Sequence, residues 1–294
     1  MRGRGYIHGI TLLGGLAMTL LSGCIRDELE TCPPLGIQLE VEDKNYANIK
    51  AANRLGFEEV RNEDLPFASY VSSLQYRLTD AETGKVIVEQ PLKAVKGEGK
   101  TVTIPVPEEI PFGRYVLTAW GNLSKDAESL GEKFTELDLH PNHIEGSDVY
   151  LVSDTLGMKR LKGKLIVAVE NMPHAYRYSE KEISSISKHV DSRLDYTGSL
   201  SFLIPTVWKQ SENIVTKTLF APSTGPVESL FKIRFYAGDN AKVNKWVAPE
   251  DISITISRNE LTVLRYVYSP SCCCFSIYVL INDNWELLHS LEID

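Results

Sequence analysis

From Ile37 onward the chain consists of short runs in which apolar and β-branched residues alternate with polar ones, and Gly, Pro, Asn and Asp separate these runs. Alternation with a period of two places the apolar side chains on one face of a strand. Residues 71–79 and 85–90 show the pattern, and the residues between them end in Gly84, which suits a hairpin turn that needs a positive φ. Many short strands divided by turn residues are typical of β-sandwiches. The sequence therefore predicts an all-β fold.

Polar and charged sequence interrupts the strand pattern between Leu123 and about Asp148, and a second series of strands opens at Leu151. We therefore expect two β-sandwich domains, an N-terminal one at 36–149 and a C-terminal one at 150–294. Pro105 has no backbone N–H to donate, so the run that contains it is expected at a sheet edge. In the second half, strands are expected at 161–170, 198–204, 214–220, 230–236, 252–257, 261–268, 273–281 and 285–291.

One segment gives a conflicting signal. Ser179-Glu-Lys-Glu182 has the spacing of a helix capping box, and Ile183, Ile186, Val190 and Leu194 recur at helical intervals. A strand would fit the surrounding pattern better. The sequence leaves helix and strand open at 179–194.

The N-terminus has the order of an export signal. Arg2 and Arg4 precede the apolar run 10–21, and Leu21-Ser-Gly-Cys24 follows it. The run is shorter than the roughly 20 residues that a membrane-spanning helix needs. A small-residue pair directly before a cysteine resembles a lipobox, in which the cysteine is acylated and becomes the first residue after cleavage. We therefore expect a signal peptide at 1–23, cleavage between Gly23 and Cys24, and lipid such as palmitate on Cys24.

Charge limits the choice of partners. The chain has 39 acidic and 31 basic residues, a formal net charge of −8. An acidic surface repels phosphate backbones, so nucleic acid is not expected as a partner. Residues 24–35 after the lipobox are rich in acidic residues and are expected to form a solvated, lipidated tether.

Beyond Cys24 the cysteines are Cys32 and the triplet Cys272–Cys274. No pair has CxxC spacing, so neither a zinc site nor a thioredoxin-like motif is predicted. In a strand, Cys272 and Cys274 would share one face and Cys273 the other. Two interpretations stay open for an exported chain: three small buried apolar side chains, or a disulfide from Cys32 to the triplet, with Cys273 as the candidate partner.

The search for catalytic chemistry finds only weak patterns. P-loop, GxGxxG and GxSxG motifs are absent, and Ser185-Ile-Ser-Lys188 matches SxxK without the companion motifs of serine acylases. No catalytic residue, metal site or cofactor is assigned, and the chain is not expected to be an enzyme. One group of residues has side chains that could bind a metal ion, but a solvated loop is the alternative: Asp138, His140, His143, Glu145 and Asp148. Four tryptophans could form a platform for sugar rings, but packing in the core is the alternative: Trp120, Trp208, Trp246 and Trp285.

Thr155 is a candidate modification site. Asp154-Thr-Leu156 resembles the short Asp-Thr-aliphatic acceptor of O-glycosylation on exported bacterial proteins. The alternative is a bare turn.

Several pieces, in their order along the chain, resemble the FimB-like fimbrial anchor lipoproteins of Bacteroides-type bacteria. They begin with Cys24, the acidic stretch 26–30 and Thr31-Cys-Pro-Pro34, and they continue with the β-run 37–41 and Asp43-Lys-Asn-Tyr46. Later pieces are Gly113-Arg-Tyr-Val-Leu-Thr-Ala-Trp-Gly-Asn122, the strand at 161–170, Glu260-Leu-Thr-Val-Leu-Arg265 and Asn284-Trp-Glu286. The triple cysteine and the helical spacing near Ile183 depart from the family pattern.

This resemblance implies two transthyretin-like β-sandwich domains and attachment to the outer membrane at the cell surface through lipid on Cys24. It further implies a place at the base of a fimbrium, or pilus, where the protein would anchor the fibre and limit its length. Fimbrial shaft subunits would be the partners, joined by strand complementation, in which one chain's extended segment completes another chain's sheet. The alternative function is a surface glycan-binding lipoprotein that works beside an uptake channel.

Overall fold

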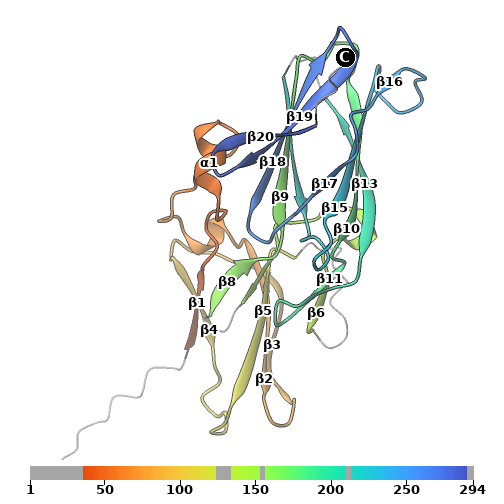
Figure 1. Ribbon diagram of the computed structural model, residues 1–294. Helices are drawn as coiled ribbons and strands as arrows, with labels where there is room; N and C mark the ends of the chain where they lie inside the picture. Colours follow the sequence, from red (N-terminus) through yellow and green to blue (C-terminus); the bar gives the residue numbers. More distant parts are fainter. Residues whose placement is uncertain (1–35, 124–133, 153–155, 209–212, 290–294) are drawn as a thin grey trace, which may run out of the picture. The chain divides into compact units, whose positions relative to one another are not determined.

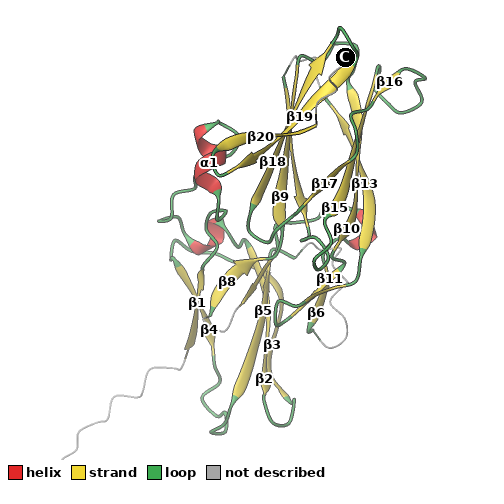
Figure 2. Cartoon of the chain, viewed as in Figure 1, coloured by secondary structure: helices red, strands yellow, loops and turns green. Residues whose placement is uncertain are grey.

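A computed structural model describes residues 36–123, 134–152, 156–208 and 213–289. Strands dominate the fold, and the helical part is confined to short segments (Figure 2). The all-β sandwich fold predicted from the alternation is thereby confirmed. The helical segments are α1 (Ile49–Arg54) and two 3₁₀ turns, η1 (Phe67–Ser69) and η2 (Pro141–His143). None of the helices in these ranges is long and apolar enough to span a bilayer.

The first sheet has seven strands in the order β3-β2-β5-β7-β8-β1-β4 (Figure 1). Its strands are β1 (Gly36–Val41), β2 (Ser73–Asp80), β3 (Val86–Ala94), β4 (Thr101–Pro105), β5 (Tyr115–Gly121), β7 (Tyr150–Val152) and β8 (Gly157–Arg160). Pro105 lies in the edge strand β4, as predicted, and Gly84 has φ +70° in the β2–β3 turn. A buried cluster that includes Leu39, Phe67 and Tyr150 packs on this sheet.

Two five-stranded sheets form the second half. One has the order β14-β9-β18-β19-β20, and the other has the order β13-β10-β15-β16, with β17 also paired to β15. The strands of the former are β9 (Gly163–Glu170), β14 (Ile214–Phe220), β18 (Leu261–Ser269), β19 (Cys274–Ile281) and β20 (Asn284–His289). Those of the latter are β10 (Tyr178–Ile186), β13 (Leu200–Val207), β15 (Ser229–Tyr236), β16 (Trp246–Val247) and β17 (Ile252–Ile254).

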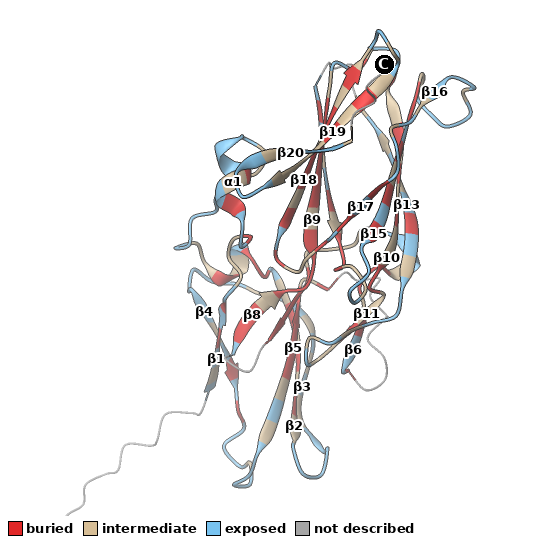
Figure 3. Cartoon of the chain, in the orientation of Figure 1, coloured by how far each residue is buried: buried red, intermediate tan, exposed pale blue. Residues whose placement is uncertain are grey.

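A small sheet of β6 (Glu136–Asp138), β11 (His189–Asp191) and β12 (Tyr196–Thr197), in the order β12-β11-β6, joins these layers. The main core lies between the two five-stranded sheets, and Figure 3 shows the buried positions along β9 and β18. Strand β7 begins at Tyr150 and β8 at Gly157, and both belong to the first sheet, so this sheet contains strands from both sides of the expected boundary. The division into domains at 149/150 stays a prediction.

The segment 179–194 that the sequence left open contains no helix: it forms β10, then β11 (His189–Asp191) and a turn. Residues 178–186 form β10, which pairs with both β13 and β15. The β10–β13 register shifts between Ile183 and Ile186, and Ser185 has φ +59° there. Such a bulge inserts one extra residue, so side chains three positions apart both face the core. Ile183 and Ile186 are both fully buried, which explains the helical spacing without a helix.

Candidate strand-docking groove

A groove of about 710 Å³ lies beside the first residues of β18. It is formed by the segment around α1, by β17 and the residues that follow it, by β18, and by the β19–β20 hairpin. The residues that line it include Asn48, Lys50, Glu228, Ser253, Glu260, Leu261, Thr262, Val263, Asp283 and Leu288. We call it the β18 groove.

The β18 groove exists because β9 and β19, the two neighbours of β18 in the sheet, pair with different lengths of that strand. On one side β9 runs parallel to β18 from Leu261 to Val267. On the other side the pairing with β19 begins only at Leu264, opposite Val279. The next two residues of β19, Leu280 and Ile281, pair with β20 on the other side of β19 and not with β18. Among the described residues, Leu261–Val263 therefore has no strand on its second side.

A side chain occupies part of this open edge. The amide of Asn48 donates from Nδ2 to the Leu261 carbonyl oxygen at 2.8 Å, and its Oδ1 accepts from the Leu261 N–H at 2.8 Å. A strand neighbour would make the same pair of hydrogen bonds. Asn48 thus satisfies the main chain at one residue of the edge, where an unpaired backbone group would otherwise lack a protein partner.

The segment around α1 also holds the terminal hairpin in place. Arg54 forms an ion pair with Asp283 in the β19–β20 turn, and the rings of Phe57 and Trp285 meet edge to face, with centroids 5.9 Å apart. Figure 1 shows α1 beside β20. At the other end of β20, His289 Nδ1 lies 3.2 Å from a Glu250 carboxylate oxygen. These contacts fix the hairpin that forms one wall of the β18 groove.

The two strands of that hairpin were expected from the sequence at 273–281 and 285–291, and the structure joins them through a two-residue turn. Asn282 and Asp283 both have positive φ, 45° and 70°, which two-residue hairpin turns require. The β19–β20 register shifts between Ile277 and Tyr278, so the alternation does not hold through the last strand. Leu287 and Leu288 are both exposed as a result, at 53% and 43%. Regular alternation along a strand would place these two leucines on opposite faces of the sheet.

A buried polar network ties the first sheet to the start of β18. Arg160 is 1% exposed, and its Nε lies 3.0 Å from both carboxylate oxygens of Asp148. Its other nitrogens donate to the Tyr150 hydroxyl and to Asn259 Oδ1. The Asp43 carboxylate accepts from Arg258 and Asn259 in the turn before β18. This network holds the turn before β18 against the first sheet.

Four of the five loop residues considered as metal ligands, Asp138, His140, Glu145 and Asp148, make structural hydrogen bonds with their side chains. His140 donates from Nδ1 to the Ile144 carbonyl, and its Nε2 accepts from the Ala221 N–H at 2.9 Å. Burial, together with nearby Lys162, lowers the pKa of His140 to about 3, so the ring is neutral. Glu145 accepts from the Leu219 N–H. Within the described ranges no three His, Cys, Asp or Glu side chains are grouped to hold a metal ion.

The tryptophans do not form the shared platform considered from the sequence. Trp120 is fully buried, Trp208 packs against Phe235 in the core, and Trp285 meets Phe57. Trp246 alone of the four is strongly exposed, at 53%.

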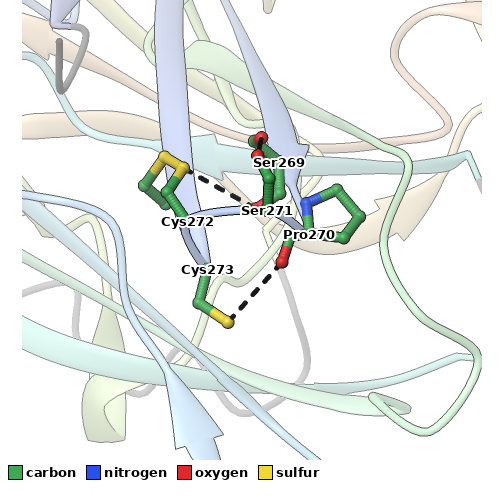
Figure 4. Close-up of a disulfide and its surroundings, with 6 residues drawn as sticks. Ser269, Pro270, Ser271, Cys272 and Cys273 are labelled. Atoms are coloured by element: carbon green, nitrogen blue, oxygen red, sulfur yellow. Dashed lines mark hydrogen bonds between the residues drawn. A yellow bond between two sulfur atoms is a disulfide. The ribbon is translucent and has the colours of Figure 1, made fainter. Parts of the chain in front are cut away.

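The other predicted site residues fall in two places. Gly23, Cys24, Cys32 and Thr155 lie outside the described residues, as do the signal peptide 1–23 and the tether 24–35, so these predictions stand as they were. Cys273 lies in the β18–β19 turn, where it is exposed with a free thiol, while Cys272 and Cys274 are joined by a disulfide (Figure 4). Cys272 and Cys273 lie in the turn and only Cys274 belongs to β19, so the strand alternation expected for the triplet does not apply. The interpretation of three buried apolar side chains is wrong, because Cys273 is exposed.

Comparison with known proteins bears on the fold. No protein-family model matches the chain, and no curated protein does. Solved structures do match. A candidate adhesin from Bacteroides ovatus gives a TM-score of 0.54 at 14% identity, covering 91% of this chain and 98% of its own. A candidate polysaccharide-binding protein from Bacteroides thetaiotaomicron gives 0.54 at 11% identity, with 86% and 98% covered. The fimbrial anchor protein Mfa2 from Porphyromonas gingivalis gives 0.49 at 16% identity, with 88% and 100% covered.

The likeness at these identities concerns the fold. The chain has the β-sandwich fold of the two Bacteroides structures, and it shares that fold over almost the whole length of each.

Proposed function

We propose that this chain is an outer-membrane lipoprotein that anchors a fimbrium at its base and limits the length of the fibre. The β18 groove would receive an extended segment of the first shaft subunit. The observation that carries the proposal is the open edge at Leu261–Val263, because main-chain groups at a free sheet edge can pair with an added strand. The lipobox at Cys24 and the resemblance to fimbrial anchors support it from the sequence.

The chemistry of the groove suits an extended peptide. Its lining combines apolar side chains such as Val263 and Leu288 with hydroxyl groups such as that of Thr262. Glu228, Glu260 and Asp283 bring three carboxylates against one amine, that of Lys50, and Arg54 already pairs with Asp283. A segment with alternating apolar side chains and a basic residue would match both the edge and this charge.

Anchoring and position at the base follow from the lipid. An acylated N-terminus holds a subunit to the bilayer, so a subunit of this kind can occupy only the membrane end of a fibre. Replacing Cys24 by Ala should move the protein out of the membrane fraction and release fibres into the medium. Sedimentation of the Cys24→Ala protein with membranes, as for the wild type, would contradict the lipid anchor.

A bulky side chain placed in the β18 groove tests whether the groove is the docking site. Ser253 is exposed on β17 and lines the groove, so a Ser253→Trp side chain can enter the groove without displacing the core. Ser201→Trp on β13 is the matched control, since Ser201 is exposed and lies outside the groove. We expect shed and overlong fibres with Ser253→Trp and normal fibres with Ser201→Trp, counted by electron microscopy of cells and medium. Normal attachment with both would reject the groove as the docking site.

The alternative function is a surface glycan-binding lipoprotein that works beside an uptake channel. Fibre attachment separates the two functions. A protein that works beside an uptake channel holds no fibre, so replacing Cys24 would leave fibre attachment unchanged. Deleting the gene and finding fibres still attached at normal length would favour this alternative.

A further inference from the structure

A transverse row of side chains crosses the outer face of the β13-β10-β15-β16 sheet. Val207 pairs with Tyr178, Tyr178 with Tyr236, and Tyr236 with Trp246, each directly opposite the next on neighbouring strands. Directly opposite residues point to the same side of a sheet, so the four side chains lie on one face. Phe235 and Trp208, the neighbours of this row along the chain, pack in the core on the other face. We call Val207, Tyr178, Tyr236 and Trp246 the aromatic row.

The aromatic row is apolar and accessible at both ends. Val207 is 63% exposed and Trp246 is 53% exposed. Between them the rings of Tyr178 and Tyr236 lie 5.6 Å apart, and Figure 1 shows their strands side by side. The guanidinium of Arg234 lies 5.8 Å from the centre of the Trp246 ring. A large aromatic side chain left in water at a sheet face forgoes the free energy of burying its apolar surface, which a ligand can recover.

Polar rows run alongside the aromatic row. Along β10, Glu180 follows Tyr178 by two residues and lies opposite Arg234 of β15. Glu182 follows by another two and lies opposite Lys232. Glu180 accepts from the hydroxyls of Tyr178 and Tyr236, one on each carboxylate oxygen, at 3.2 and 2.8 Å. These bonds fix both rings at the edge of the row. With Leu203, the four charged residues line a small hollow.

The balance of charge on this face selects the kind of ligand. Opposite charges are interspersed on this face: Glu180 lies opposite Arg234 and Glu182 opposite Lys232 in strand register, and Lys232 Nζ lies 3.1 Å from an Asp251 carboxylate oxygen. A strongly charged partner gains little there. An uncharged ligand with many hydroxyl groups gains hydrogen bonds from the charged pairs, while its apolar face can pack on aromatic rings.

We propose that the aromatic row and the hollow beside it form a carbohydrate-binding face for neutral polysaccharide. The C–H faces of separate sugar rings along one glycan pack on Trp246 and on Tyr178, which lie on either side of Tyr236 in the row, and the hydroxyls bond with Glu180 and Arg234. This site shares no residue with the β18 groove and does not depend on strand docking. A glycan bound here would give the protein a second attachment surface.

The test uses the full mature protein and a set of named neutral probes: dextran, yeast mannan, arabinogalactan and xyloglucan. Migration in native gels that contain each polysaccharide detects weak binding, and the gel concentration that halves mobility gives the affinity. We expect retardation by at least one probe and a loss of affinity of tenfold or more in Trp246→Ala. Tyr178→Phe keeps the ring and should bind nearly as the wild type does, whereas Tyr178→Ala should weaken binding severalfold.

Phe112→Ala is the matched control, because Phe112 is a fully exposed aromatic residue in the loop between β4 and β5, away from the row. Its retardation should equal that of the wild type. Three results would overturn the proposal: no retardation by any of the four probes, equal affinity in Trp246→Ala and the wild type, or an equal loss in Phe112→Ala. Circular dichroism of each variant establishes that it is folded, and Trp246→Ala, which changes an exposed side chain, provides the readout if Tyr178→Ala is not.

Discussion

The side-chain amide of Asn48 makes both of its hydrogen bonds to the main chain of one residue, Leu261, 213 positions away in the sequence. It occupies the place that a neighbouring strand would take on the open edge of β18. A fimbrial segment that extends this sheet would pair beside Asn48 or displace it. The segment around α1 therefore both protects the edge and borders the groove.

Removing the Asn48 amide should destabilise the fold measurably. Asn48→Ala loses two part-buried hydrogen bonds, each worth roughly 0.5–1.5 kcal/mol, so the free energy of unfolding should fall by about 1–3 kcal/mol. Asn45→Ala is the control, since Asn45 makes the same two-bond contact with the backbone of Arg61 at an exposed site. Urea denaturation compares the two. An equal cost for both would show that the contact with Leu261 has no special role.

Breaking the buried network at Arg160 should cost more. Arg160→Met leaves the Asp148 carboxylate without its cation, and the loss of one partner of a buried pair typically costs about 3–5 kcal/mol. The exposed pair Arg177–Asp239 supplies the control, because Arg177→Met should cost less than about 1 kcal/mol. Thermal and urea unfolding measure both variants. A small effect at Arg160 would mean that the network does not join the first sheet to the β18 turn.

Stability should rise with pH because of Lys181. Burial lowers the pKa of Lys181 to about 8, while its Nζ donates to the hydroxyls of Thr216 and Thr218. Above pH 8 the unfolded chain keeps a proton that the folded chain has lost, so the stability increases as pH rises towards 10.5. From pH 7 to 9.5 the wild type should gain about 2 kcal/mol relative to Lys181→Met.

Urea denaturation of the wild type and Lys181→Met at the two pH values gives this difference, and other titrating groups cancel in it. Lys85→Met, at an exposed turn, should show no such change. A constant difference between the wild type and Lys181→Met across this range would contradict a lowered pKa at Lys181.

Local patterns in the sequence predicted strands well and strand partners poorly. The run 214–220 coincides with β14, because alternation and flanking turn residues are local signals. The bulge at Ser185 shifted the alternation by one residue and imitated a helix, since spacing alone cannot distinguish an inserted residue from a helical turn. The final hairpin was predicted, but its register shift near Ile277 was not.

The candidate sites depend on contacts between distant parts of the chain, which the sequence pattern does not contain. The open edge of β18 results from its parallel pairing with β9, about a hundred residues earlier, and from the point at which β19 leaves it. The aromatic row joins Trp246 to two tyrosines through strand register. Reasoning from tryptophans alone found Trp246 but grouped it with three that the fold places elsewhere.

The most direct test of the account places a photo-crosslinking amino acid at Leu288, an exposed residue that lines the β18 groove, in cells that assemble fibres. The same substitution at Val116, which is 50% exposed on β5, is the control. The account predicts an adduct from Leu288 to an extended segment of a fimbrial shaft subunit, identified by peptide mass spectrometry, and none from Val116. Adducts from both positions, or none from Leu288 while fibres remain attached, would contradict docking in the β18 groove.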